Sequence, residues 1–192
     1  MIIWINGAFG AGKTQTAISL RHRLPNAFIY DPEEAGFYIK KHIPDSMQKP
    51  DFQEHTLWRS IVREHLAYMA ANTADIIIVP MTITEPSYYK EIIGQLRSDG
   101  HRVYHLVLAA SEETLRGRLA KRGNRQNSWA ARQIPRCVQG LSSPIFENKL
   151  ATDNMSIDET VAAIGRQAGL RLQKDHRSWW KTQWPRLTSR WR

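Results

Sequence analysis

The segment GAFGAGKT at positions 7–14 combines residue types that suit the binding of a phosphate group. It lies between a short apolar run at 2–5, typical of a buried strand, and a stretch at 15–24 with apolar residues at helical spacing. Glycine lets backbone N–H groups turn inward around an anion, and the N-terminus of the following helix adds partial positive charge. A strand-to-helix turn that merely needs glycine is the alternative, but the correct flanking elements favour phosphate binding.

In such a loop, Lys13 is expected to contact the β- and γ-phosphates of a nucleotide and Thr14 to ligate Mg²⁺. The residues predicted to contact the nucleotide in this segment are Gly7, Ala8, Phe9, Gly10, Ala11, Gly12, Lys13, Thr14 and Gln15.

Asp31 is the first candidate for acid–base chemistry because it ends the second predicted strand, at 27–31. Its carboxylate would stand beside the phosphate loop, where it could hold Mg²⁺ through water or accept the proton of a substrate hydroxyl. The alternative is a helix N-cap, because Asp caps helices well and Pro32 is a good first helical residue. Glu33 and Glu34 fit better as charged partners of the helix N-terminus than as catalysts.

Composition predicts a single cytoplasmic domain. A chain of 192 residues can bury a core without disulfide or metal support, and the single Cys137 excludes an internal disulfide. The longest apolar run, IIIVPM, is far shorter than the roughly 18 to 20 residues of a spanning helix. Because the phosphate loop begins at residue 7, we expect no signal peptide. The formal net charge is +9, and residues 170–192 supply seven Lys or Arg against one acid.

Predicted strands and helices alternate after the phosphate loop, at 27–31, 33–41, 56–72, 75–83, 86–98, 102–110 and 112–121. Such alternation predicts βαβ crossovers and helices on both faces of a parallel sheet. A short fifth apolar segment, IFENKLATD, precedes a helix whose start is marked by the capping-box pair Ser156 and Glu159. We therefore expect a three-layer α/β/α fold with a five-stranded, mostly parallel sheet and the phosphate loop at its carboxyl edge.

The sequence resembles the P-loop kinases, the class of nucleoside monophosphate and shikimate kinases, over residues 1–168. More closely, WINGAFGAGKTQTA, YDPEEAGF, IIIVPMTI, NSWAARQI and GLSSPIFENKLATDN are similar to the ATP-binding tunicamycin-resistance proteins of bacteria. The resemblance implies a nucleotide-binding domain at 1–168, ATP binding and resistance to a nucleoside antibiotic. It also implies that the adenine is received around Thr152 to Asn154, with Asn154 as a contact.

By this resemblance, the arginine-rich stretch after the fourth strand is a lid over the nucleotide, at about 122–136. Arginine binds phosphate oxygens through two parallel N–H groups and stays charged. Arg118 and Arg122 stand four residues apart on one predicted helix face, so both should reach the same point and stabilise the transferring phosphoryl group. Two further arginines fit the lid or a solvated surface equally well, Arg125 and Arg132.

The acceptor is expected near the stretch between the second and third strands and the end of the third strand. Phe37 and Trp58 could stack on a uracil ring, and Arg59 could hydrogen-bond to its carbonyls. Trp58 also fits an apolar helix stripe, and packing is the favoured interpretation for it. Met81 and Thr82 face the cleft if the strand ends there, or are ordinary strand-end packing.

The C-terminal stretch 169–192 holds four of the seven tryptophans, and one helical stripe would contain Trp180, Trp184, Leu187 and Trp191. Tryptophan with Lys and Arg is typical of an interfacial helix on anionic lipid, although Pro185 interrupts the stripe. Docking on the domain itself, or a basic arm that binds nucleic acid, are the alternatives, nucleic acid being the least favoured. The favoured hypothesis is contact with the inner face of the cell membrane.

Two functions fit these features. The first is a phosphotransferase that moves the γ-phosphoryl group of ATP to a hydroxyl of a tunicamycin-like antibiotic, with Asp31 as base. In this function Lys13, Arg118 and Arg122 stabilise charge. The second is a protein that sequesters the drug, with ATP serving only to close the lid. A switch GTPase is disfavoured because the third strand ends without a carboxylate and the chain lacks an NKxD motif.

Overall fold

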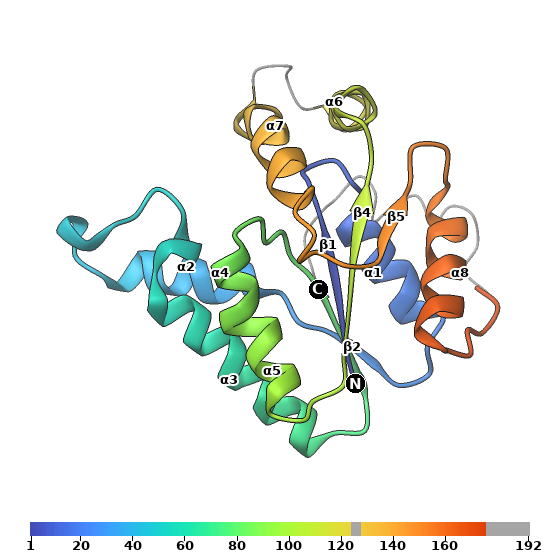
Figure 1. Cartoon of the computed structure of the whole chain (residues 1–192), viewed down its shortest axis with the longest axis horizontal. Helices are drawn as coiled ribbons and strands as arrows, with labels where there is room; N and C mark the ends of the chain where they lie inside the picture. Colours follow the sequence, from blue (N-terminus) through green and yellow to red (C-terminus); the bar gives the residue numbers. More distant parts are fainter. Residues whose placement is uncertain (124–127, 176–192) are drawn as a thin grey trace.

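The computed structural model describes residues 1–123 and 128–175 and contains a five-stranded sheet in which all neighbouring strands are parallel. From β1 to β5, the strands span Ile2–Gly7, Ala27–Ile29, Ile76–Pro80, Val103–Ala109 and Lys149–Ala151. Their order in the sheet is β2–β3–β1–β4–β5, so β1 is central (Figure 1). Because the strands are parallel, the segments that follow them meet at one edge of the sheet, where ligands bind in folds of this class.

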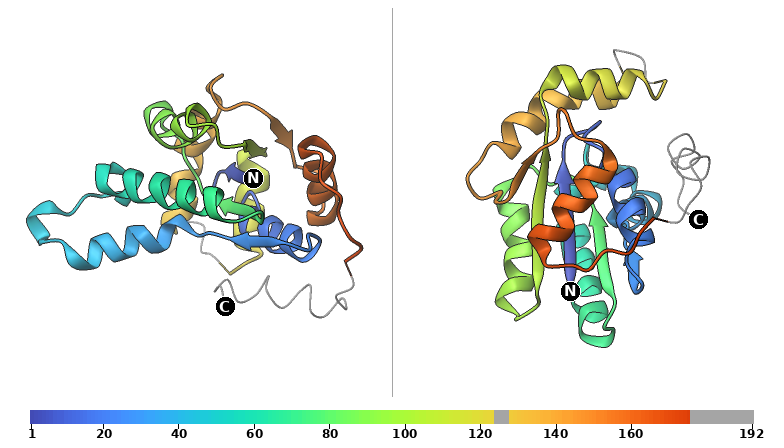
Figure 2. Two further views of the ribbon diagram at one scale, coloured as in Figure 1. Left: turned by 90° about the horizontal axis from the view of Figure 1, so that it is seen from below. Right: turned by 90° about the vertical axis from the view of Figure 1, so that its right-hand side faces the viewer.

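From α1 to α8, the helices span Lys13–His22, Pro32–His42, Thr56–Asn72, Pro86–Tyr89, Gln95–Ser98, Glu112–Ala120, Trp129–Leu141 and Ile157–Ala168. A π-helical segment, Lys90–Gly94, joins α4 and α5, and the 3-10 helices η1 (Asp45–Met47) and η2 (Phe52–Glu54) lie between α2 and α3. Figures 1 and 2 show α3, α4 and α5 on one face of the sheet and α1 and α8 on the other. Helices α6 and α7 stand above the carboxyl edge.

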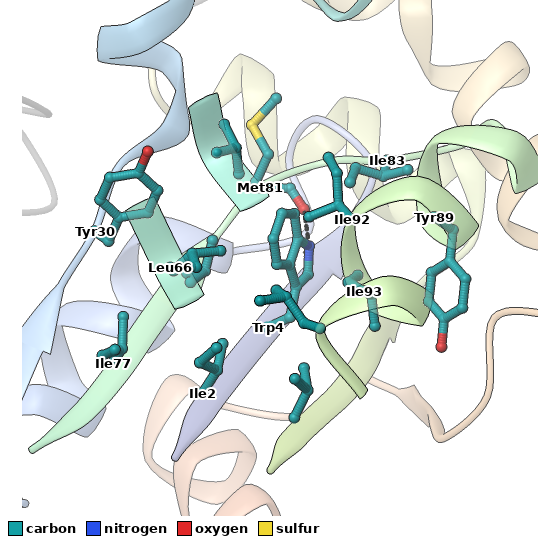
Figure 3. Packing of buried hydrophobic residues seen from close by; sticks show 14 of the residues in the cluster. Ile2, Trp4, Tyr30, Leu66, Ile77, Met81, Ile83, Tyr89, Ile92 and Ile93 are labelled. Atoms are coloured by element: carbon teal, nitrogen blue, oxygen red, sulfur yellow. Dashed lines mark hydrogen bonds between the residues drawn. The ribbon is translucent and has the colours of Figure 1, made fainter. Parts of the chain in front are cut away.

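Side chains of β1 alternate between the two faces of the sheet and fill two hydrophobic cores. Ile2 and Trp4 pack with α3 and the α4–α5 helix, whereas Ile3 and Ile5 pack with α1 and α8. All four side chains are fully buried. Figure 3 shows Trp4 in the first core, where its Nε1 donates to the Met81 carbonyl at 3.0 Å. This bond ties the central strand to the segment that follows β3 and borders the site.

The expected α/β/α fold is confirmed, and the sheet is wholly parallel. One local prediction is wrong: β2 ends at Ile29, so Asp31 is not a strand residue but the N-cap of α2. The stretch predicted as a lid, 122–136, begins in the turn after α6 and ends inside α7. Ser128 caps α7 by accepting a hydrogen bond from the Ala131 N–H, which explains where that helix begins.

The chain continues to pack on the domain beyond α8. Leu170 and Leu172 lie against the second core, and a Cβ added at Gly165 would stand 2.6 Å from Leu172 Cδ1. The Gln173 N–H donates to the Arg23 carbonyl at 2.8 Å, and Arg23 Nε donates to the Gln173 carbonyl at 3.0 Å. The packed part of the chain therefore reaches Gln173, beyond the predicted boundary at residue 168.

Within the described residues, no helix has both the length and the apolar character that crossing a membrane requires. The predicted tryptophan stripe of the tail lies outside the described residues, and so does Arg125 of the predicted lid.

Candidate active site

The phosphate loop connects β1 to α1, as predicted, and its glycines are needed for backbone reasons. Gly10 and Gly12 have φ values of 87° and 95°, in the left-handed region that side chains disfavour. A Cβ at Gly10 would also come within 2.7 Å of the Leu115 carbonyl oxygen of α6. Gly12 is the N-cap residue of α1, so the loop delivers its N–H groups to a helix N-terminus, where an anion is stabilised.

Lys13 is folded back onto its own loop. Its Nζ donates to the carbonyl oxygens of Gly7 at 2.9 Å and Ala8 at 3.2 Å and lies 5.5 Å from the centroid of the Phe9 ring. Burial lowers the pKa of Lys13 to about 8. Thr14 follows as the second residue of α1 and is partly exposed. The lysine is thus a half-buried cation held beside the position that phosphate would take.

A cavity of about 540 Å³ opens on one side of the loop, lined by Ala11, Gly12, Gln15, Arg118, Lys121, Arg122, Thr152, Met155, Ser156, Ile157 and Thr160. Arg118 and Arg122 both line it, so the structure brings together the two arginines that the sequence placed on one helix side. Burial and the charge of Arg118 lower the pKa of the Arg122 guanidinium. Two facing cations in one cavity make it suitable for a polyphosphate.

The segment predicted to receive adenine is already engaged in hydrogen bonds. The Thr152 N–H donates to the Ala109 carbonyl at 2.7 Å, and the Thr152 carbonyl accepts from Arg118. Asp153 accepts from the Ser111 N–H at 2.9 Å and from Thr114 Oγ1 at 2.8 Å, which lowers the pKa of Asp153 to about 2. These bonds hold in place the part of the cavity wall that Thr152 forms.

Asn154 does not line this cavity in the structure. It is exposed, whereas Thr152 and Met155 on either side of it line the wall. The structure therefore favours these neighbours over Asn154 as contacts of the base.

A second cavity, of about 240 Å³, opens on the other side of the loop and is lined by Phe9, Glu33, Phe37, Lys40, Pro50, Asp51, Phe52, Gln53, Met81, Thr82, Thr84, Trp129 and Arg136. Three of the residues predicted to contact substrate are here, namely Phe37, Met81 and Thr82. Phe37 and Phe52 meet edge to face at 6.2 Å, and Phe9 and Trp129 do so at 5.0 Å. The cavity therefore offers aromatic surface next to the phosphate loop.

Trp58 and Arg59 are not on this wall. Trp58 is fully buried, and its Nε1 donates to the Pro32 carbonyl at 2.9 Å, which corrects its assignment as a substrate residue in favour of packing. Arg59 pairs with Glu91 at 2.5 Å and lies over the Tyr88 ring at 4.4 Å. Trp58 is therefore held in the core, whereas Arg59 is held by an ion pair with the exposed Glu91.

Comparison with known proteins agrees with this geometry. A family model described as an AAA domain matches residues 2–144. The chain belongs to this family. Among solved structures, the tunicamycin resistance protein of Deinococcus radiodurans is 31% identical, with a TM-score of 0.77 and coverage of 90% of this chain and 98% of that chain. The predicted resemblance to P-loop kinase-like proteins of this kind is confirmed. No curated protein matches the chain.

Two more distant structures show the same fold. A sugar kinase from Janibacter is 17% identical with a TM-score of 0.62, covering 88% of this chain and 94% of that chain. The shikimate kinase of Bacteroides thetaiotaomicron is 16% identical with a TM-score of 0.60, covering 88% and 99% respectively. Together with the phosphate loop, the family supports a nucleotide-binding, kinase-like role for this AAA-domain protein.

In this AAA-domain protein, Glu33 rather than the predicted Asp31 is the carboxylate that lines the second cavity. Asp31 Oδ1 accepts from the Glu33 N–H at 3.0 Å, the cap geometry that was the alternative for Asp31, and Asp31 does not line the second cavity. Glu33 does line it. Burial, followed by the charge of Asp31, raises the pKa of Glu33. Sequence reasoning assigned Glu33 to the helix dipole because its position gave no sign of which way the side chain would point.

Helix α7 supplies two further residues of the second cavity that were missed, Trp129 and Arg136. They stand seven residues apart, two helical turns, and so share one side of α7. Arg136 lies 3.8 Å from Asp51 across the cavity. The spacing of Trp129 and Arg136 on one helix face could have linked them in the sequence. This link would have required the prediction of a helix here instead of a lid.

The residues near the phosphate loop fit a magnesium ion by the chemistry of their donors. Thr14 and Asp31 offer a hydroxyl and a carboxylate, the oxygen ligands that Mg²⁺ takes from a protein while it keeps water and phosphate oxygens. Among the described residues, no group of three or more His, Cys, Asp or Glu could hold a metal ion.

Proposed function

We propose that this protein is a phosphotransferase that moves the γ-phosphoryl group of ATP to a hydroxyl of tunicamycin or a related nucleoside antibiotic. One observation carries the proposal: the phosphate loop lies between two cavities, with Ala11 and Gly12 lining the larger and Phe9 the smaller. A nucleotide in the first and an acceptor in the second would meet at the loop. The name of the Deinococcus relative supplies the antibiotic.

Three cations would stabilise the transferring group. Lys13 would contact the β- and γ-phosphates, and Arg118 and Arg122 would neutralise the oxygens of the γ-phosphoryl group. Mg²⁺, held by Thr14 and Asp31, would supply further neutralisation of phosphate charge. In a cavity partly closed to water, such preplaced charges stabilise the transition state more than they would in solution.

Glu33 is the better candidate for the group that orients the acceptor hydroxyl, in place of Asp31. Glu33 lines the second cavity, where the acceptor would bind, and its raised pKa makes it a stronger base than an ordinary glutamate. The hydroxyl oxygen would bond to the γ-phosphorus while the bond from that phosphorus to the β–γ bridging oxygen breaks. The hydroxyl proton would pass to the Glu33 carboxylate, and Asp31 would keep its cap and Mg²⁺ roles.

The aromatic lining of the second cavity favours one alternative, sequestration of the drug without chemistry. Phe9, Phe37, Phe52 and Trp129 can hold a planar base by stacking alone. ATP would then act only by closing the cavity over the drug.

Incubation with tunicamycin and γ-labelled ATP separates the two functions. Phosphotransfer predicts label in the drug, and the same protein carrying Lys13→Met should transfer none. Tight stoichiometric binding of unlabelled drug would instead support sequestration. Absence of both label and binding would contradict the assignment of tunicamycin as ligand.

A further inference from the structure

The carbonyl oxygen of Gly7, at the end of β1, accepts hydrogen bonds from two different parts of the site. Lys13 Nζ donates to it at 2.9 Å and Thr82 Oγ1 at 2.7 Å. A carbonyl oxygen has two lone pairs, so both donors can be accommodated together. Gly7 is buried and Thr82 is only 9% exposed, so water has little access to this oxygen.

The backbone around Thr82 is fixed to β1 on both sides. Met81 donates its N–H to the Ile5 carbonyl at 3.2 Å and accepts from Trp4 at 3.0 Å, the bond drawn in Figure 3. The amide of Asn6 bonds to both the N–H and the carbonyl of Ile83, at 3.0 and 2.9 Å. The Thr82 hydroxyl is therefore delivered to the Gly7 carbonyl by a rigid segment.

Nucleotide binding would change which donors the Gly7 carbonyl oxygen has. For Lys13 Nζ to bind the phosphates in place of the Gly7 and Ala8 carbonyl oxygens, it has to leave these two oxygens, to which it donates in this structure. A buried acceptor that loses its donor carries an unfavourable free energy, whereas an acceptor that keeps one partner does not. Thr82 stays in place while Lys13 moves, because the rigid segment does not depend on the lysine.

We propose that Thr82 is a positioning residue for nucleotide binding: it keeps the Gly7 carbonyl hydrogen-bonded after Lys13 leaves for the phosphates, and so makes that movement less costly. The proposal rests on nucleotide binding by Lys13 but on no particular acceptor. It assigns Thr82 a role in the loaded state, in addition to its place on the acceptor cavity.

The free protein should tolerate loss of this hydroxyl. In Thr82→Val the Gly7 carbonyl still has Lys13 as a partner, and valine has the shape of threonine. The cost appears only when Lys13 moves, so nucleotide affinity should fall while the melting temperature hardly changes. A merely structural role of Thr82 would lower the melting temperature instead.

Calorimetric titration with Mg·AMP-PNP, together with thermal melts, tests the proposal on five proteins: wild type, Thr82→Val, Thr82→Ser, Lys13→Met and the double variant Lys13→Met/Thr82→Val. We expect Thr82→Val to raise the Kd about tenfold, and Thr82→Ser, which keeps the hydroxyl, to stay within about twofold of wild type. In the Lys13→Met background the carbonyl has already lost the lysine, so adding Thr82→Val should lower the melting temperature by clearly more than it does alone.

Unchanged affinity in Thr82→Val would overturn the proposal. So would a drop in melting temperature that is the same with and without Lys13, or no binding of Mg·AMP-PNP by the wild type. Failure of phosphoryl transfer to tunicamycin by a wild type that binds Mg·AMP-PNP would count against the proposed function and leave this inference standing.

Discussion

Burial disfavours the charged form of Lys13, although this charge is what would bind the phosphates. Its Nζ is held by two carbonyl oxygens, yet burial disfavours its charge and lowers its pKa to about 8. Because the folded-state pKa lies below the ordinary value of 10.5, the lysine costs stability at neutral pH, and this cost begins to fall as the pH rises through about 8 and is gone only above the ordinary value of 10.5. Phosphate would add counter-charge to that of Glu33, which already opposes the effect of burial on the pKa of Lys13.

This predicts that the affinity for Mg·ADP falls as the pH rises through about 8. Above that pH the free protein must first protonate Lys13 before the phosphates can use its charge, so the Kd should rise about tenfold per pH unit. Lys13→Arg, which stays charged, should give a nearly flat profile between about pH 7 and 9. A wild-type profile as flat as that of the arginine variant would contradict the assigned titration.

Glu33→Gln should reduce phosphoryl transfer about 100-fold or more while raising the melting temperature at neutral pH. The stability change follows from the raised pKa of Glu33: ionisation of this carboxyl opposes folding above its folded-state pKa and not below its ordinary value of 4.5. The gain should therefore be present at about pH 7 and absent at about pH 4 in thermal melts. Transfer that survives in Glu33→Gln would remove Glu33 from the chemistry.

Asp31→Asn provides the comparison, because asparagine keeps an oxygen that can accept from the Glu33 N–H and cap α2. We expect a melting temperature close to wild type and a smaller loss of transfer than in Glu33→Gln. The reverse ranking, with Asp31→Asn the more damaging, would return the role of base to Asp31.

The sequence predicts the role of a residue in this site when that role depends only on its neighbours in the chain. The roles of Gly10, Gly12 and Lys13 follow from their own backbone and from contiguous spacing. Choosing between Asp31 and Glu33 depends on where β2 ends, two residues earlier than the apolar pattern suggests. For Trp58 the apolar helix stripe favoured packing over stacking on a base, and the buried side chain agrees with packing.

At the scale of elements, α7 forms one wall of the acceptor cavity, and its position is set by close contact with the segment after β3. A Cβ added at Gly140 would stand 2.8 Å from Thr84 Cβ and 3.1 Å from the Thr84 carbonyl oxygen. Edge-to-face contact between Trp129 and Phe9, at 5.0 Å, joins the other end of α7 to the phosphate loop. The first part of α7 was predicted to belong to a lid because the resemblance and the density of arginines, rather than apolar spacing, guided that prediction.

Gly140→Ala should therefore destabilise the protein by about 1–3 kcal/mol, because the added methyl group forces α7 away from Thr84. Gly117→Ala is a matched control in α6, where a Cβ meets nothing within 4 Å and alanine should add up to about 1 kcal/mol of helix stability. Urea denaturation of both variants measures the difference. Equal stability of the two would show that α7 does not pack as described.

At the scale of the whole molecule, the parallel sheet with helices on both faces follows from the strand–helix alternation, which is why the fold was predictable, although the order of the strands was not predicted. The end of the domain was not predicted, since Leu170 and Leu172 pack against the second core, with Leu172 next to Gly165 of α8. Two leucines in a basic stretch carry no periodicity that would mark them.

Truncation tests this boundary. A chain ending at Ala168 should lose about 1–3 kcal/mol of stability, because Leu170 and Leu172 no longer cover the second core and the Gln173–Arg23 bonds are lost. A chain ending at Asp175 should melt as the full chain does. If the proposed membrane contact of the tail exists, the Asp175 truncation should also abolish sedimentation with anionic liposomes. Equal melting of the two truncations would place the boundary at residue 168 after all.

The proposed function requires that the two cavities beside the phosphate loop are occupied at the same time. Calorimetric titration of tunicamycin into protein saturated with Mg·AMP-PNP tests this requirement. We expect one drug molecule to bind per chain, at least as tightly as to the nucleotide-free protein, while AMP-PNP stays bound. Displacement of AMP-PNP by the drug, or the absence of drug binding to either form, would contradict it.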